Sequence, residues 1–338
     1  MGYNKTCYRR KDALSDIVSI ILIASVVTSA ISVIMLWGIP YMDNEKANSR
    51  AESALYQFIN IDTSIKDIIT QGVGSKRYVN FITDAGYLHL RPQGTFWVIY
   101  YSVIEDFDFN VSSFEENSFD FDLKRNSGID DHTEFLFNAT SIDKEESDNT
   151  LESVTLGTTE TIVFDDITFD SSITINIEDD VEDILIGKIW VFDLGSILYE
   201  TSSSDRTFNI IIQNGAVLFG TESSQYVTNE PNIYNTDEKF VMRIIEFEYD
   251  SQTIGGGRGN YRFAVNLQKS SVPENRRTIP EYLKMQISGN QADAWISFFR
   301  SHQGFDQFDD EQGILYREAE TIFSLTHSTC AIELEVQG

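Results

Sequence analysis

Residues 17–39 read IVSIILIASVVTSAISVIMLWGI, an uncharged segment of 23 residues whose polar side chains are all serine or threonine, apart from the indole of Trp37. As an α-helix this segment would be about 34 Å long at about 1.5 Å per residue, enough to cross a hydrocarbon core of about 30 Å. Trp37 and Tyr41 stand at its far end, where amphipathic rings favour the membrane interface. We therefore predict one membrane-spanning helix over residues 17–39, with a buried core helix as the alternative.

The residues before this segment set its orientation. Among the first twelve residues, four basic side chains oppose the single acid Asp12: Lys5, Arg9, Arg10 and Lys11. Because basic flanks stay in the cytoplasm, we expect a single-pass protein of the cell membrane with a cytoplasmic N-terminus and an extracellular remainder. An ordinary secretory signal peptide cleaved after Ala30 is the alternative, but the apolar run continues well past that residue.

The segment after Pro40 predicts a second, amphipathic helix that continues the first. Apolar residues recur there in steps of three and four, which defines one helical face. This face comprises Ala47, Ala51, Ala54, Leu55, Phe58, Ile61, Ile65, Ile68 and Ile69. Gly72 supplies the stop, and Gly38 with Pro40 predicts a kink or local melting between the helices. The resulting rod, from about Leu14 to Thr70, would be about 85 Å long if straight, with its apolar face packed on its own globular domain.

Short β-branched and aromatic runs separated by turns dominate the chain from Arg77 onward. The predicted strands cover residues 87–90, 95–104, 161–164, 173–177, 189–192, 208–212, 216–219, 239–249, 261–267, 283–287, 318–325 and 330–336. Asn214 and Gly215 predict a hairpin turn, because both suit positive φ angles, and residues 290–301 predict a short helix. The fold class is therefore α+β: a long N-terminal transmembrane and amphipathic helix, then a β-rich, sandwich-like extracellular head.

Acidic residues are abundant and unevenly distributed. The 338 residues carry 25 basic and 53 acidic side chains, a formal net charge of −28. This acidity argues against nucleic acid as a partner, because phosphate binding needs clustered lysine and arginine. Residues 105–200 hold 26 of the acids and only 4 bases. We interpret residues 105–186 as an acidic insertion in the head.

The acidic segment gives two site predictions. Its carboxylate clusters predict a solvated, cation-screened acidic surface, with weak Ca²⁺ sites, which take oxygen ligands of this kind, as the alternative. These clusters are Asp120 with Asp122, Asp165 with Asp166, and residues 178–183. Asn110 and Asn138 open Asn-x-Ser/Thr sequons, which predict N-linked glycans on an exported domain.

The sequence contains no recognisable catalytic motif. The four histidines lack metal-ligand spacing, and residues 255–259 (GGGRG) lack the Gly-Lys-Ser/Thr of a phosphate loop, so we expect a hairpin loop there. Cys7 and Cys330 fall on opposite sides of the predicted membrane, so they cannot pair within one unprocessed chain. We expect no catalytic, cofactor or metal-binding residues; an exported enzyme tethered by the helix, with a site built from distant residues, is the alternative.

The junction before the apolar helix resembles that of a known family. Residues 9–11 (RRK), residues 12–16 (DALSD), the apolar helix and the amphipathic helix together resemble an archaeal type IV pilin-like protein, of the superfamily that includes archaellins. The resemblance implies a class III signal peptide, cut by a prepilin peptidase between Ala13 and Leu14. The basic residues of this leader are Arg9, Arg10 and Lys11. Asp12 departs from the basic or small residue usual at that position.

The same resemblance implies how the rest of the chain is divided. It implies a leader of residues 1–13, a helical stalk of residues 14–72 and a head of residues 73–338. Residues 292–295 (ADAW), followed by Phe298 and Phe299, are similar to a short helix of such heads, with ordinary core packing of Trp295 as the alternative. Residues 187–338 are similar to these heads only loosely, and residues 105–186 show no resemblance.

The function implied by the resemblance is that of a structural subunit of a surface filament with an adhesive role. Its partners would be further copies of itself, a prepilin peptidase with the pilus assembly machinery, and the membrane through residues 17–39. Asp16 would pair with the α-ammonium group of a neighbouring subunit, or else cap the helix at the cytoplasmic interface. A non-polymerising, singly anchored surface or receptor protein is the alternative.

Overall fold

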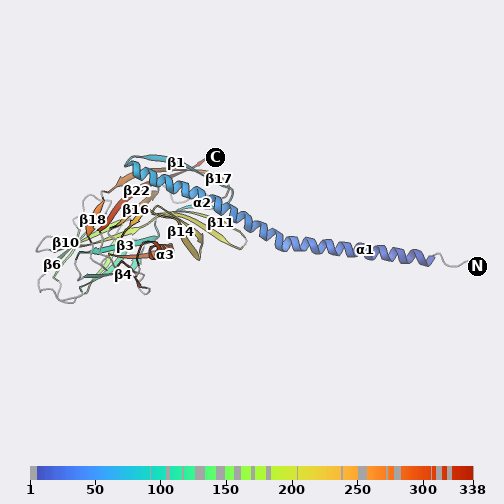
Figure 1. Ribbon diagram of the computed structural model, residues 1–338, viewed down its shortest axis with the longest axis horizontal. Coiled ribbons are helices and arrows are strands. Elements are labelled where there is room, and N and C mark those ends of the chain that lie inside the picture. Colours follow the sequence, from blue (N-terminus) through green and yellow to red (C-terminus); the bar gives the residue numbers. More distant parts are fainter. Residues whose placement is uncertain are drawn as a thin grey trace, which may run out of the picture.

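A long helical rod leads into a strand-rich head in the computed structural model of the chain (Figure 1). The α+β class predicted from the sequence is therefore confirmed. The structure describes residues 6–91, 93–103, 107–115, 118–125, 134–141, 149–155, 161–168, 172–179, 184–203, 205–236, 239–249, 257–271, 273–277, 283–305, 307–309, 314–317 and 322–337. In the rod, side chains are described from Ile17 onward.

The rod consists of α1 (Thr6–Val33), a π-helical turn η1 (Ile34–Gly38) and α2 (Ile39–Gln71) in direct succession. Its described part begins at Thr6, so residues 6–13 of the predicted leader share the helix with the apolar stretch. At the other end, Gly72 stops the helix as predicted. Its amide donates to the carbonyl of Ile68 at 3.1 Å, and its φ of 96° is one that glycine adopts without a steric cost.

A π-helical turn replaces the predicted local melting between the two helices. Pro40 has no N–H to donate, and its ring crowds the preceding turn of a regular α-helix. The amide of Ile39 donates to the carbonyl of Ile34, a five-residue step that widens the turn and keeps the backbone helical. Of the two predicted alternatives, a kink or local melting, the structure shows the kink, because the rod changes direction between α1 and α2 while the backbone stays helical (Figure 1).

The part of the head that the structure describes contains 22 strands in four sheets. A six-stranded sheet has the order β1 (Lys76–Thr83), β17 (Gly259–Ser270), β22 (Ile322–Gln337), β16 (Lys239–Tyr249) and β15 (Ile233–Asn235), with β18 (Glu274–Arg277) also paired to β22. A five-stranded sheet has the order β14 (Ser224–Asn229), β13 (Ala216–Thr221), β12 (Thr207–Gln213), β11 (Ser196–Ser202) and β2 (Tyr87–Arg91).

Two further sheets contain most strands of the acidic segment. An eight-stranded sheet has the order β20 (Gln307–Asp309), β21 (Ile314–Arg317), β19 (Leu283–Gly289), β3 (Thr95–Ser102), β10 (Ile184–Asp193), β9 (Ser172–Asp179), β6 (Glu134–Ser141) and β7 (Asn149–Thr155). A three-stranded sheet has the order β4 (Phe107–Glu115), β5 (Ser118–Arg125) and β8 (Thr161–Thr168). Strands β6, β7 and β9 of the acidic segment thus extend the sheet that β3 and β10 also form.

The last strand of the chain corrects two predictions. β22 pairs in parallel with β16 on one side and antiparallel with β17 on the other. It therefore separates β16 from β17, so the glycine-rich residues 255–259 do not connect the two strands of a hairpin. The two strands predicted at residues 318–325 and 330–336 are one strand from Ile322 to Gln337, because neighbours on both sides satisfy the backbone of the polar residues between them.

The predicted turn and the predicted short helix of the head are both confirmed. Asn214 and Gly215 form the turn between β12 and β13, with φ angles of 49° and 66°. The predicted short helix is present as α3 (Ala292–His302). Trp295 of this helix is fully buried, its ring centroid lies 4.7 Å from that of Trp97, and its indole N–H donates to Gln213 Oε1 at 2.7 Å. Core packing, the alternative stated for Trp295, is what the structure shows.

Two hydrophobic clusters form the core of the head. The first joins one face of α2 to the six-stranded and five-stranded sheets, with Phe58 in edge contact with Phe81 at 5.3 Å between ring centroids. The second lies around Trp97, Trp190 and α3, and includes residues of β16 and β22. The predicted apolar face of α2 is therefore buried in the head, which fixes the direction in which the rest of the rod leaves it.

Candidate functional site

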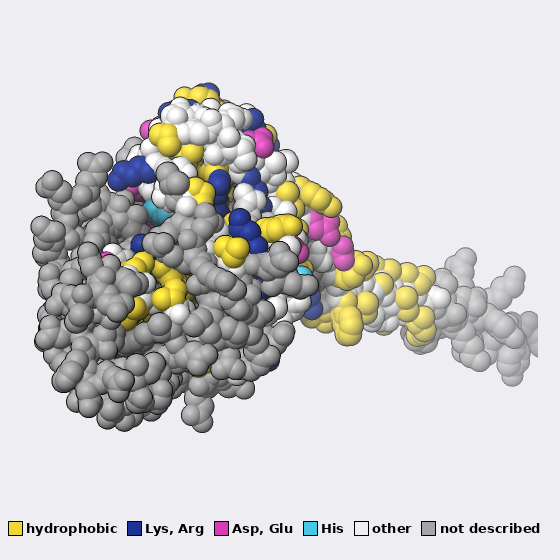
Figure 2. All heavy atoms as spheres, turned by 60° about the vertical axis from the view of Figure 1, so that its left-hand side comes forward, with side chains coloured by type: hydrophobic (Ala, Val, Ile, Leu, Met, Phe, Trp, Pro, Cys, Tyr) yellow, Lys and Arg dark blue, Asp and Glu magenta, His cyan; other side chains and the backbone are white. Residues whose placement is uncertain are grey.

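The apolar part of the rod is exposed on all sides. From Ile17 to Trp37 its large hydrophobic side chains are between 49% and 78% exposed. Figure 2 shows apolar side chains covering the stalk where it leaves the head. Among the described residues, this is the helix long and apolar enough to cross a membrane, as a membrane anchor or a signal sequence does. An apolar surface of this extent is stable only against lipid or against another protein.

Three of the five hydroxyl groups within this stretch donate hydrogen bonds to the backbone of the helix itself. Ser25 donates to the carbonyl of Leu22 at 2.9 Å, and Thr28 donates to that of Ala24 at 2.8 Å. Ser32 donates in turn to the carbonyl of Thr28 at 2.8 Å. Because a hydroxyl group that lacks a hydrogen bond is costly in hydrocarbon, these internal bonds make the three side chains compatible with a lipid environment.

The predicted processing residues lie in the first turns of α1. Ala13 and Leu14 are consecutive helical residues, and Asp16 follows on the same helix. The basic leader residues Arg9, Arg10 and Lys11 precede them in the helix. The structure describes the backbone of these residues and not their side chains, so the roles of the scissile bond and of Asp16 stay predictions.

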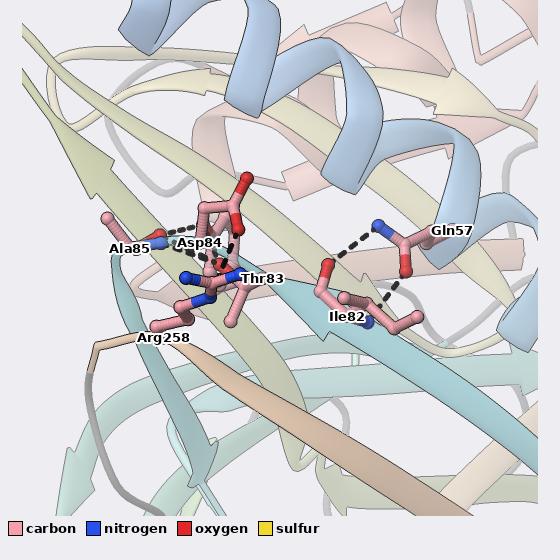
Figure 3. A network of polar contacts seen from close by, with 7 residues as sticks. Gln57, Ile82, Thr83, Asp84, Ala85 and Arg258 are labelled. Atoms are coloured by element: carbon pink, nitrogen blue, oxygen red, sulfur yellow. Dashed lines mark hydrogen bonds and ion pairs between the residues drawn. The ribbon is translucent and has the colours of Figure 1, made fainter.

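A pair of hydrogen bonds joins α2 to the edge strand β1 of the head. The amide nitrogen of Gln57 donates to the carbonyl of Ile82 at 3.0 Å, and the amide of Ile82 donates to Gln57 Oε1 at 2.8 Å (Figure 3). Both are backbone groups of β1, the edge strand of the six-stranded sheet. The sequence analysis did not identify Gln57, because no local pattern indicates which strand a helix will meet.

A second polar contact involves the carboxyl group of Asp62, which is buried between α2 and the five-stranded sheet. Asp62 is fully buried, and its Oδ2 lies 2.7 Å from Lys66 Nζ. Asn229, at the end of β14, donates to the same oxygen at 2.6 Å. Burial raises the pKa of the Asp62 carboxyl above its ordinary value, although Lys66 and Asn229 act in the opposite direction. A signal for this site was present in the sequence, since Asp62 lies on the otherwise apolar face between Ile61 and Ile65.

Two more contacts join α2 to the head at its two ends. Asn44, a little beyond the apolar stretch, donates to Asp205 Oδ2 in the turn between β11 and β12 at 3.1 Å. Near the other end, Arg77 Nη1 lies 2.5 Å from Asp67 Oδ2. The head is therefore attached to the helix from Asn44 to its C-terminal turns, and the apolar stretch before Asn44 is left outside the head.

The sites predicted in the acidic segment are only partly described. Asn110 lies in β4 and Asn138 in β6, and the structure gives no account of their side chains. The same holds for Asp122, Asp165 and Asp166, and residues 180–183 lie outside the described residues. Within the described part of the chain, no three His, Cys, Asp or Glu side chains are grouped so that they could hold one metal ion.

The contacts of the histidines bear on the alternative of a tethered enzyme. Ser301 lines a groove of about 600 Å³ beside α3, and its Oγ lies 2.6 Å from Nδ1 of His302. The single hydroxyl hydrogen of Ser301 is donated to the carbonyl of Ser297, also at 2.6 Å. With the hydroxyl hydrogen donated to Ser297, the Ser301 oxygen accepts from the His302 tautomer that carries a hydrogen on Nδ1, which is the reverse of activation by a general base.

A second histidine contact lies in the core. Nε2 of His327 is 2.6 Å from Glu246 Oε2, and both side chains are more than nine-tenths buried. The ring of Phe192 stacks on His327 with 5.8 Å between centroids. This buried pair links β16 to β22 under an aromatic ring, and neither residue is among those that line the grooves beside α3 and α2.

The comparisons with known proteins concern the head. No curated protein and no solved structure matches the chain. A family described as a family of unknown function, DUF7289, matches residues 136–328, which is more than half of the chain. The match begins in β6, within the acidic segment, and ends in β22, so it contains α3 and excludes the N-terminal rod. The chain therefore belongs to DUF7289, a family of unknown function.

Proposed function

We propose that the chain is a pilin-like structural subunit of an archaeal surface filament, anchored in the membrane or polymerised through its N-terminal helix. The observation that carries this proposal is the division of one rod into two parts. Residues 17–39 expose apolar side chains on all sides, whereas the face of α2 from Ala47 to Ile69 is buried in the head. The resemblance of residues 9–16 to a class III processing site supports the same assignment.

The exposed and the buried part of the rod would have different roles in such a subunit. In the membrane, the exposed stretch is covered by lipid, with the basic N-terminus in the cytoplasm and the sandwich-like head outside the cell. Cleavage between Ala13 and Leu14 keeps the apolar stretch on the mature chain. It can then leave the bilayer and exchange lipid contacts for side-chain packing against the helices of other copies. The acidic heads form the outer, adhesive face of the filament.

The position of the mature N-terminus is the first test. Protein purified from the cell envelope of the source organism is analysed by intact mass spectrometry and N-terminal sequencing. Leu14 as the first residue is the expected result. A chain that begins at Met1 in assembled material overturns the processing step, and a chain that begins after Ala30 overturns the anchor and identifies a secretory signal.

Filament assembly is the second test, and the chain offers a matched pair of variants. Asp16→Asn removes the acid that would pair with a neighbouring α-ammonium group, and Asp12→Asn changes an acid in the leader. Electron microscopy with an antibody to the head should show filaments for the Asp12 variant and few or none for the Asp16 variant. Uniform envelope labelling of the unaltered protein, without filaments, would instead indicate the non-polymerising surface protein.

A further inference from the structure

Two reactive side chains from distant parts of the chain meet at one buried oxygen atom. Lys66 Nζ of α2 and Asn229 Nδ2 of β14 lie 2.7 Å and 2.6 Å from Asp62 Oδ2. An amine and a carboxamide are the two reactants of an amide exchange. Because both groups are hydrogen-bonded to the same atom, they are held near each other, which lowers the entropic cost of bringing them together.

The position of the lysine is fixed by a third contact. Lys66 Nζ also donates to the backbone carbonyl of Glu230, the residue after Asn229, at 2.6 Å. The side chain of Lys66 is 19% exposed, and its stem passes Gly215, where an added Cβ atom would lie 3.8 Å from Lys66 Cε. The amine is therefore held against the segment that contains Asn229 and is largely shielded from water.

Asp62 has the properties of a proton carrier between the two groups. Its side chain is fully buried, and Oδ1, the oxygen that does not contact Lys66 or Asn229, has no hydrogen-bond partner among the described residues. Burial raises the pKa of this carboxyl, which makes it ready to accept a proton from a neighbouring ammonium group. Isolated burial of a carboxylate is costly, so the protonated acid is the favoured end state once its cation is consumed.

We propose that Lys66 and Asn229 form an intramolecular isopeptide bond, with Asp62 as the catalytic acid and base. Asp62 accepts a proton from the Lys66 ammonium group, and the neutral amine attacks Cγ of Asn229. The new bond joins Lys66 Nζ to Asn229 Cγ, and the bond from Cγ to Nδ2 breaks. Nδ2 leaves as ammonia, so the reaction needs no oxidant, reductant or added reagent.

The hydrogen atoms and charges balance in this sequence. Of the three hydrogens on the Lys66 ammonium group, one stays on the new amide nitrogen, one passes to the departing Nδ2 and one remains on Asp62. An ion pair is converted into a neutral amide and a neutral carboxylic acid. The product therefore leaves no unpaired charge in the buried site, which favours completion of the reaction.

The bond would connect the rod to the head covalently. Without it, α2 is attached to the five-stranded sheet by packing and by hydrogen bonds such as the one from Asn229 to Asp62. With it, a pull on the N-terminal helix is transmitted to β14 through an amide bond. The inference does not depend on filament formation, because it concerns one chain and applies equally to an anchored monomer.

The experiment is mass spectrometry of the folded, full-length protein. The intact mass should be lower than that of the sequence by one ammonia, about 17 Da. Trypsin should then give a branched peptide in which residues 51–76 are joined to residues 207–239, because a modified Lys66 is no longer cleaved. An intact mass equal to that of the sequence, with separate linear peptides 51–66 and 207–239, overturns the proposal.

The peptide pattern and two variants distinguish the isopeptide bond from other reactions that release ammonia. Succinimide formation at Asn229 also releases ammonia but leaves Lys66 cleavable, so mass loss without the branched peptide overturns the proposal. Lys66→Arg keeps a cation beside Asp62 and should restore the full mass. Asp62→Asn keeps the shape of the site and should slow bond formation by about 100-fold or more. Equally rapid formation in that variant would overturn the role of Asp62 and leave the bond itself supported.

Discussion

The side-chain amide of Gln57 occupies the place of a neighbouring strand beside Ile82. Its nitrogen donates to the Ile82 carbonyl at 3.0 Å, and its oxygen accepts from the Ile82 amide at 2.8 Å (Figure 3). β1 has β17 on one side, and no strand is paired to its other side among the described residues. Unpaired edges invite pairing with other chains, so α2 both packs on the head and protects its edge at this point.

Gln57→Ala should destabilise the junction between rod and head. The variant leaves both backbone groups of Ile82 without their partner, which should lower the free energy of unfolding by about 1–2 kcal/mol. Urea denaturation followed by circular dichroism measures this change. Gln71→Ala, at the exposed end of α2, is the matched control and should change stability by less than about 0.5 kcal/mol. Equal effects of the two variants would contradict the role of Gln57.

Charges placed in the exposed apolar stretch should prevent stable membrane association. Ile23→Lys combined with Val27→Lys adds about 3 kcal/mol per residue to the cost of membrane insertion. Expressed protein should then shift from the carbonate-resistant membrane fraction to the soluble or aggregated fraction. Glu52→Lys combined with Tyr56→Lys, on the exposed side of α2, is the control and should leave the protein in the membrane fraction. Retention of both double variants in the membrane would contradict the assignment of the span.

The thiol of Cys330 should be inert in the folded protein. Burial raises its pKa from 9.0 to about 12, so the thiol is neutral and enclosed at pH 8. In a Cys7→Ser background, iodoacetamide at pH 8 should add to Cys330 only after unfolding, as intact mass will show. Rapid labelling of the folded protein would contradict this environment.

The same pKa shift predicts the alkaline dependence of stability. Between about pH 9 and about pH 12, the folded protein retains the Cys330 proton that the unfolded chain has lost. The folded state binds more protons in this window, so the contribution of Cys330 to stability falls as the pH rises through it. Cys330→Ala should remove this part of the slope when the free energy of unfolding is measured against pH. An unchanged slope would contradict the shift.

Gly289 should be intolerant of a side chain, and the chain provides a control with the same backbone angle. Gly289 and Gly257 both have a φ of 98°, so alanine is strained at either position. A Cβ at Gly289 would lie 2.3 Å from the carbonyl oxygen of Gly94, whereas nothing lies within 4 Å of one at Gly257. Gly289→Ala should therefore cost about 1–3 kcal/mol more than Gly257→Ala in urea denaturation. Similar losses would show that backbone angle alone decides the effect.

Elements whose structure depends on residues close in sequence were predictable. The apolar run of residues 17–39, the stripe from Ala47 to Ile69 and the Asn214-Gly215 turn each express a local preference that tertiary contacts reinforce. The π-helical turn was not predictable in this way. Pro40 indicates a disturbed helix, but how the backbone resolves the disturbance depends on competing hydrogen bonds of similar energy.

The sequence by itself determined that this protein has an uncharged apolar helix near its N-terminus, an amphipathic continuation and a strand-rich head. These elements can be recognised from residue composition and from the spacing of apolar residues, because that spacing places them on one face of a helix or strand. Only the tertiary structure decided that β22 separates β16 from β17, that Gln57 meets Ile82 and that Asp62 meets Asn229. Backbone hydrogen bonds are chemically alike along every strand, so the choice of partner comes from long-range packing that no local segment encodes.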